Sequence, residues 1–208
     1  MMVMVANRSG IEVGYMAGRF PGSVGHLYSP GAERGPYGFM PYALDNGAFA
    51  AWQKHADWDE ASWRWTLNWA ALSGQKPLWA LVPDVVADRV KTLASWAQYA
   101  WMVRGYGFRP AFALQDGMTF EDVPDADCVL FIGGSTEWKD AAIEPWCKRF
   151  PGRVHVGRVN GWDRLLRCYR AGAISVDGTG WFQKVGGQAA DLARFLQMQP
   201  PARFGGNP

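Results

Sequence analysis

The sequence predicts one α/β domain over residues 1–199, a compact (β/α)8 TIM-type barrel with room for one irregular unit. Short apolar runs rich in β-branched residues alternate along the chain with longer segments of helical periodicity. Parallel strands need a crossover between them, so this alternation predicts a parallel sheet. Seven strand candidates in a chain of 208 residues suit a closed barrel better than an open doubly wound sheet.

The strand candidates share a length of three to five residues and an apolar, largely β-branched or aromatic composition. They are Val3–Ala6, Tyr42–Leu44, Leu78–Val82, Ala111–Leu114, Cys128–Ile132, Val154–Gly157 and Ala173–Val176.

Five helices are predicted between these strands, at Asp59–Leu72, Asp88–Arg104, Lys139–Phe150, Trp162–Ala171 and Gln188–Met198. The first begins at an acidic cap and is expected to bury Trp63, Leu67 and Ala70. In the second, Gly105 acts as the stop, and the expected apolar face is Val90, Leu93, Ala97, Ala100 and Trp101.

Further expectations concern less regular features and the tryptophans and cysteines. Pro145 should bend or break its helix. The Gly- and Pro-rich stretch Gly14–Phe39 should be a long functional or mobile loop, and Pro200–Pro208 a disordered tail. Trp63, Trp96, Trp101 and the three cysteines should be core residues, whereas Trp181 is a candidate for contact with a ligand.

Composition narrows the class of protein. Hydrophobic residues make up 49% of the chain and charged residues 19%, which supports a sizeable core and excludes a disordered chain. Cys128, Cys147 and Cys168 form no CxxC pair or Cys/His cluster, so we expect no disulfide framework and no zinc site. The first ten residues lack a charged flank and no apolar stretch reaches about 20 residues, so we expect a cytoplasmic protein with no signal peptide and no membrane partner.

The most informative feature is the group that follows each strand run. Six consecutive strands end in polar residues or glycines, and in a parallel barrel these ends converge on the face that carries the chemistry. A single Asp there is usually a cap or turn residue, but six such groups in succession indicate a site. They are Asp45-Asn46-Gly47-Ala48-Phe49, Pro83-Asp84, Gln115-Asp116-Gly117, Gly133-Gly134-Ser135, Arg158-Val159-Asn160-Gly161 and Asp177-Gly178-Thr179-Gly180.

These residue types limit the possible reactions. The strand ends contain no histidine, since His155 lies inside a strand run and His26 and His55 in loops, so a serine or cysteine triad is not expected. Two carboxylates flanking a sugar can transfer a glycosyl group, one attacking C1′ and the other handling the proton. A carboxylate, a carboxamide and a backbone N–H can also read the edge of a purine.

In this order the motifs resemble the tRNA-guanine transglycosylase superfamily, and most closely its short phage members, the DNA 7-deazaguanine transglycosylases of the DpdA group. The resemblance covers about Tyr42 to Trp181. The family's Asp-Ser-Gly-Gly-aromatic motif corresponds to residues 45–49, its Gln-Gly-Gly to residues 115–117, its Ile-Gly-Gly to residues 132–134, and its Gly-Val-Gly segment to residues 156–161. Asn46 and Ala48 depart from that pattern.

The resemblance implies a (β/α)8 barrel and a pentosyltransferase that exchanges guanine for a 7-deazaguanine, such as 7-cyano-7-deazaguanine, without a cofactor. Asp177 would be the nucleophile and Asp45 the general acid/base. Phe49 would stack on the base. The remaining implied substrate-binding residues are Asp84, Gln115, Gly133, Gly134 and Gly157.

The expected nucleic-acid partner is DNA, because the family's tRNA-acting members carry a Cys-rich zinc site that this chain lacks. Residues 139–170 hold eight bases and three acids, a weak sign of phosphate contact. The candidate phosphate contacts are Arg158, Arg164, Arg167 and Lys139. If the chain is phage-encoded, its location would be the host cytoplasm.

Three alternatives stay open. The chain could act on tRNA, or it could be a nucleosidase or deoxyribosyltransferase that uses the same two carboxylates on free nucleosides. It could also be a non-catalytic nucleic-acid-binding subunit, which would make Asp177 or Asp45 dispensable. The sequence does not decide whether the chain forms a homodimer.

Overall fold

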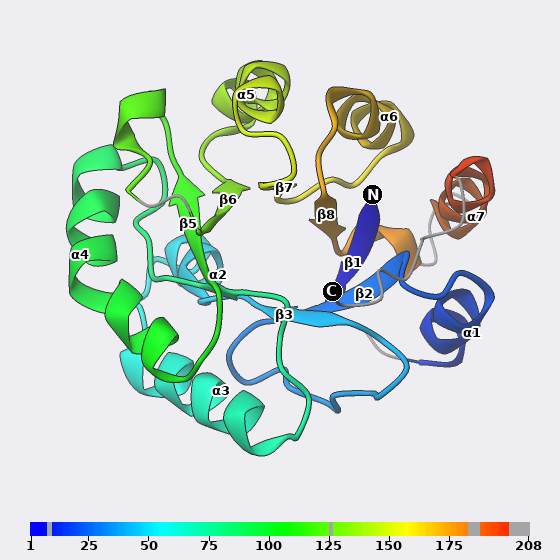
Figure 1. Cartoon of the computed structure of the whole chain (residues 1–208), viewed down its shortest axis with the longest axis horizontal. Helices are drawn as coiled ribbons and strands as arrows, with labels where there is room; N and C mark the ends of the chain where they lie inside the picture. The colour runs from blue at the N-terminus through cyan, green and yellow to red at the C-terminus, as the bar shows by residue number, and fades with distance from the viewer. Residues whose placement is uncertain (8–9, 125–126, 183–187, 200–208) are drawn as a thin grey trace.

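The computed structural model describes residues 1–7, 10–124, 127–182 and 188–199. Eight parallel strands close into a barrel in chain order, with β8 pairing back to β1, and helices surround them (Figure 1). The predicted barrel is thus confirmed, and within these ranges seven α-helices accompany it. The strands are β1 (Met2–Ala6), β2 (Val24–Tyr28), β3 (Tyr42–Leu44), β4 (Ala80–Leu81), β5 (Pro110–Leu114), β6 (Val129–Ile132), β7 (Val154–Val156) and β8 (Ser175–Gly178).

Apart from α2, the helices lie outside the barrel wall (Figure 1). The helices are α1 (Ile11–Arg19), α2 (Ala48–Gln53), α3 (Glu60–Leu72), α4 (Arg89–Gly105), α5 (Thr136–Arg149), α6 (Trp162–Ala171) and α7 (Gln188–Met198).

Alternation along each strand divides the core into two layers, because successive side chains of a strand point to opposite faces. One layer fills the barrel interior and includes Met4, Leu27, Trp79 and Val129. The other, larger layer packs the outer barrel wall against the helices. The same alternation, continued past the end of each strand, determines which of the following residues face the mouth of the barrel.

The stretch Gly14–Phe39 is only partly irregular, so the expectation of one long loop was wrong. It contains the second half of α1 and all of β2, which pairs with β1 and β3. Glycines interrupt the apolar pattern of both elements, so the sequence did not predict them. Gly25 is needed inside β2, since a Cβ atom there would lie 2.7 Å from the backbone oxygen of Pro41.

Two predicted helices begin at carboxylate caps, of which the cap at Asp59 was predicted. The Asp59 side chain accepts from the Ser62 N–H at the start of α3, and Asp88 caps α4 in the same way. Trp63, Leu67 and Ala70 are buried, as predicted. The bounds of α6 and α7 also agree with the prediction.

The predicted apolar face of α4 was wrong in part. Val90 is 71% and Trp101 64% exposed, whereas the buried side chains are Thr92, Trp96, Ala100, Met102 and Val103. This helix is apolar on several sides, so periodicity does not mark one face. Gly105 is the last helical residue and not a stop outside the helix.

Other differences are small shifts. Ser135 caps α5, which therefore starts before Lys139 and continues through Pro145 without a break. Strand β8 extends to Gly178, which places Asp177 inside it. Cys128, Cys147 and Cys168 are buried and unbridged, as expected. The predicted tail at 200–208 lies outside the described residues, and in the described ranges no helix is long and apolar enough to cross a bilayer.

Candidate active site

A pocket of about 540 Å³ opens at the carboxyl-terminal end of the barrel, a size typical of sites for small ligands. Several of its polar residues follow an inward-facing strand residue by two positions, so they lie on the same side of the chain. Ser29 follows Leu27, Asp45 follows Ala43, and Gln115 follows Ala113, each by two residues. Most predicted site residues line it: Asp45, Phe49, Asp84, Gln115, Gly133, Gly134, Lys139, Arg158, Arg164 and Asp177.

On one side of the pocket, Asp45 is held by the end of β2. Its Oδ2 atom accepts from the Ser29 hydroxyl at 2.7 Å, and its Oδ1 atom accepts from the Asn46 N–H at 2.8 Å. Ser29 is itself fixed by two hydrogen bonds to the side chain of Asn7. Burial and the negative charge of Asp177 raise the pKa of Asp45, and the bond from Ser29 partly opposes this rise. Asp45 thus retains a proton more readily than an ordinary aspartate.

Next to Asp45, a ladder of side-chain hydrogen bonds joins the ends of β3, β4 and β5. The Asn46 amide donates to Asp84 Oδ1 at 2.6 Å, and Gln115 Nε2 donates to Asp84 Oδ2 at 2.6 Å. Gln115 Oε1 accepts from the Ala87 N–H at 2.8 Å. Burial raises the pKa of Asp84 to about 6, with Asp45 adding to the rise and the Asn46 bond opposing it. The ladder fixes the two groups that were predicted to read a purine edge.

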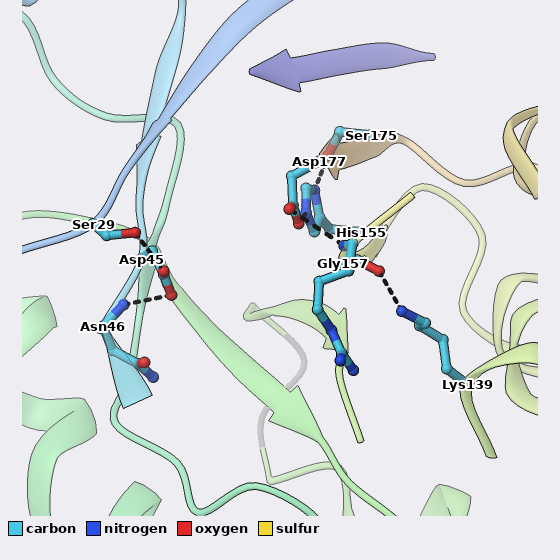
Figure 2. A network of polar contacts seen from close by, with 9 residues as sticks. Ser29, Asp45, Asn46, Lys139, His155, Gly157, Ser175 and Asp177 are labelled. Atoms are coloured by element: carbon cyan, nitrogen blue, oxygen red, sulfur yellow. Dashed lines mark hydrogen bonds and ion pairs between the residues drawn. The ribbon is translucent and has the colours of Figure 1, made fainter. Parts of the chain in front are cut away.

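On the opposite side of the view in Figure 2, Asp177 ends a buried chain of three side chains. His155 Nε2 lies 3.0 Å from Asp177 Oδ1, and His155 Nδ1 lies 2.7 Å from the Ser175 hydroxyl. Asp177 Oδ2 also accepts from the Arg158 N–H at 3.3 Å. Both oxygens of the carboxylate are therefore held by donors near the floor of the pocket.

The hydrogen-bonded residues Ser175, His155 and Asp177 are of the same types as a hydrolase triad, but they are arranged in the opposite orientation. Ser175 is buried below the pocket and is not among its lining residues, whereas Asp177 lines it. In a serine hydrolase the serine faces the substrate and the aspartate is the distant member. His155 lies inside β7, as predicted, but the sequence did not predict its contact with the strand-end Asp177 from one layer below. His26 was misplaced, since it lies in β2 and not in a loop.

Arg158 crosses the pocket from the end of β7 toward α2. Its guanidinium carbon lies 4.2 Å from the centre of the Phe49 ring, and its Nη2 atom donates to the Gly134 carbonyl oxygen. Trp52 stacks near Phe49, with 5.7 Å between ring centres and 27° between ring planes. The backbone of Arg158 has a φ of +58°, which is uncommon outside glycine and concentrated at functional sites. Arg158 and Trp52 therefore both lie against the aromatic ring predicted to stack on a base.

The other predicted phosphate contacts already have partners. Lys139 is buried on α5 and donates to the Gly157 carbonyl oxygen at 2.9 Å, and burial lowers its pKa to about 8 (Figure 2). Arg164 makes a bidentate ion pair with Asp140 at 2.7–2.8 Å, at the edge of the pocket. Arg167 pairs with Glu144 at 2.9 Å and is not part of the pocket lining.

The predicted site glycines make room for neighbouring side chains. A Cβ atom on Gly133 would lie 3.0 Å from Gln115 Nε2, and one on Gly134 would lie 2.5 Å from Asp116 Oδ1. Gly157 is outside the pocket lining, and a Cβ atom there would meet the Phe131 ring at 2.7 Å. Trp181 is fully buried, so the expected ligand contact does not arise in this conformation.

Sequence reasoning missed the residues that support the two carboxylates: Asn7, Ser29, His155 and Ser175. A period-two signal marks two of them, Ser175 and Ser29, whereas His155 is placed by its register with Ser175. Ser175 precedes Asp177 by two residues on β8, His155 pairs with Ser175 across the sheet, and Ser29 lies two residues beyond the inward Leu27. In the part of the chain that is described, no cluster of three or more His, Cys, Asp or Glu side chains could hold a metal ion.

No protein-family model matches the sequence, and no curated protein matches it.

Proposed function

We propose that this chain is a nucleic-acid guanine transglycosylase, which exchanges guanine in DNA for a 7-deazaguanine through a covalent glycosyl-aspartate intermediate. One observation carries the proposal: two carboxylates line one pocket in different environments. The pKa of Asp45 is raised by burial and by Asp177, as a proton-transfer group requires. Asp177 is held through both oxygens by His155 and the Arg158 backbone, as an oriented nucleophile requires.

In the first step, a carboxylate oxygen of Asp177 attacks C1′ of the target nucleotide. The C1′–O bond forms as the C1′–N9 bond breaks, and the electron pair of the broken bond goes to N9. The protonated Asp45 supplies a proton to the departing guanine.

In the second step, the incoming 7-deazaguanine gives its N9 proton to Asp45. Its N9 then attacks C1′ as the C1′–O bond breaks and returns its electrons to Asp177. Two inversions at C1′ retain the β configuration, and Asp45 ends in the protonated form in which it began.

Base recognition is assigned to the ladder that follows β4 and β5. Asp84 would accept from the N1–H or the 2-amino group of the base, and Gln115 would donate to O6 through its second amide hydrogen. Gly133 supports this role because a Cβ atom there would crowd the Gln115 amide at 3.0 Å. Stacking of the base on Phe49 requires the Arg158 guanidinium to leave the ring.

A DNA target must leave its base stack to reach Asp177, at a cost of about a few kcal/mol. Once moved from Phe49, Arg158 is the basic residue best placed to contact a phosphate at the mouth. The pairing of Arg164 with Asp140 and of Arg167 with Glu144 favours a second candidate, a nucleosidase or deoxyribosyltransferase acting on free nucleosides. Such an enzyme needs the two carboxylates and no phosphate contacts.

The test offers isotope-labelled 7-cyano-7-deazaguanine with duplex DNA, with tRNA and with free deoxyguanosine, followed by digestion and mass analysis. Asp177→Asn is compared with Asp163→Asn, an exposed aspartate outside this pocket. We expect label in deoxynucleosides from DNA with the wild type and Asp163→Asn, and none with Asp177→Asn. Label only in tRNA or only in free nucleosides would show that DNA is not the substrate. An active Asp177→Asn would refute the role of Asp177 as the nucleophile.

A further inference from the structure

His155 is a polar residue in a largely apolar part of the barrel interior. It is fully buried, and its ring stacks on Phe131 with 4.8 Å between ring centres. Trp79 meets the same ring edge-on at 4.9 Å. The neighbouring interior side chains are largely apolar. A buried imidazole is tolerated only when its nitrogens are hydrogen-bonded, and both nitrogens of His155 are.

The direction of these two hydrogen bonds follows from the partners. An ionised carboxylate can only accept, so Nε2 must carry a hydrogen when Asp177 is ready to attack C1′. In the neutral imidazole, Nδ1 then accepts from the Ser175 hydroxyl, which fixes the tautomer and the ring plane. Ser175 lies opposite His155 in the β7–β8 register, so the strands themselves set this geometry.

Resting on the proposed function, we propose that His155 is a positioning residue that acts through Asp177 and mainly assists the second half-reaction. In the second half-reaction the C1′–O bond breaks and negative charge returns to Asp177. A hydrogen bond to Oδ1 stabilises that returning charge and makes the carboxylate a better leaving group. In the first half-reaction the same bond fixes the carboxylate plane while weakening its nucleophilicity.

The competing explanation is that the Asp177 carboxylate merely satisfies a buried imidazole. A purely structural bond would affect stability and leave the balance between the two half-reactions unchanged. A leaving-group role predicts that the covalent intermediate accumulates when the donor is removed, because its breakdown slows more than its formation.

The test compares three variants in the full chain. His155→Phe keeps a ring between Phe131 and Trp79 but removes the donor, and His155→Gln keeps an amide donor. Val129→Ala perturbs the same interior layer at a residue outside the pocket lining, and so controls for general loss of packing. Each is assayed for label exchange into the nucleic acid that the wild type accepts, for KM, and for the fraction of enzyme carrying the glycosyl adduct by intact mass.

We expect His155→Phe to lower kcat by about 10- to 100-fold, the loss of one hydrogen bond to a charged group, with KM little changed. The adduct fraction should rise in His155→Phe, and His155→Gln should recover to within about 5-fold of the wild type. Val129→Ala should lower stability and leave the adduct fraction unchanged. Wild-type-like kinetics in His155→Phe, or a loss of kcat without more adduct, would overturn the leaving-group role.

Two further measurements keep the test decisive. Should His155→Phe not fold, Ser175→Ala replaces it and should raise the adduct fraction by a smaller amount, and no rise would count against the proposal. Nitrogen NMR of the wild-type imidazole, which needs no activity, should show a protonated Nε2. A bare Nε2 would overturn the pairing itself. A wild type that exchanges no base in any acceptor but shows a protonated Nε2 would refute the proposed function and the leaving-group role, and leave the hydrogen bond standing.

Discussion

The contact between Arg158 and Phe49 leads to a prediction that runs against the usual effect of removing a pocket arginine. A base that stacks on Phe49 must first displace the guanidinium, which also donates to the Gly134 carbonyl oxygen. A cation–π contact at a partly exposed site contributes about 0.5–1 kcal/mol, and a hydrogen bond from a charged donor about 1.5–3 kcal/mol. Because the displaced group regains water, we expect a net cost of about 1–2 kcal/mol, or about 5- to 30-fold in affinity.

The perturbation is Arg158→Asn, because asparagine tolerates the positive φ at this position better than most residues. The assay is calorimetric titration of free 7-cyano-7-deazaguanine into the wild type, Arg158→Asn and the control Arg164→Asn. Arg158→Asn should bind the free base about 5- to 30-fold more tightly than the wild type, and Arg164→Asn with unchanged affinity. Weaker binding by Arg158→Asn would refute the displacement and show that the guanidinium contacts the bound base.

Three other predictions concern the supports of the pocket. Ser29→Ala removes a bond that lowers the pKa of Asp45, so this pKa should rise further. Because Asp45 acts in its protonated form, the basic limb of the exchange pH profile should move to higher pH, and an unmoved limb would separate Asp45 from proton transfer. Burial raises the pKa of Asp84 from 3.8 to about 6, so ionisation opposes folding and wild-type stability falls as pH rises through this window. The difference in free energy of unfolding between Asp84→Asn and the wild type, measured by urea titration, should therefore change with pH. It should shift by about 2–3 kcal/mol in favour of the variant from about pH 4 to about pH 7, and a pH-independent difference would contradict this. Gly157→Ala places a Cβ atom 2.7 Å from the Phe131 ring and should lower the free energy of unfolding by about 1–3 kcal/mol in thermal or urea melts, whereas unchanged stability would mean that the ring moves freely.

Much of the barrel follows from local sequence signals. Apolar runs mark seven of the eight strands, and carboxylate caps mark the starts of α3 and α4. Strand β2 was missed because Gly25 and His26 break its apolar pattern, and because its neighbours are rich in glycine and proline. Its identity is set by pairing with β1 and β3, a tertiary effect that no local window contains.

For the site, the strand-end residues could be predicted from the sequence, but the residues that support them could not. Strand-end position alone placed Asp45, Gln115 and Asp177 in one pocket, because parallel strands bring their carboxyl ends together. The supporting shell was not predictable from motifs, since the His155–Asp177 contact depends on register between β7 and β8. The pairing of Arg164 with Asp140 was equally hidden, because those residues lie on different helices.

The central claim is that Asp177 forms a covalent bond to the sugar, and trapping that bond tests it most directly. The wild type is mixed with guanine-containing DNA, quenched with acid, digested and mapped by mass spectrometry, with Asp163→Asn as the matched control. We predict a mass increase corresponding to the glycosyl group and its attached nucleic acid on the peptide that contains Asp177, its absence in Asp177→Asn, and its loss when excess 7-cyano-7-deazaguanine is added before the quench. Base exchange without any adduct, or an adduct on another residue, would contradict the account.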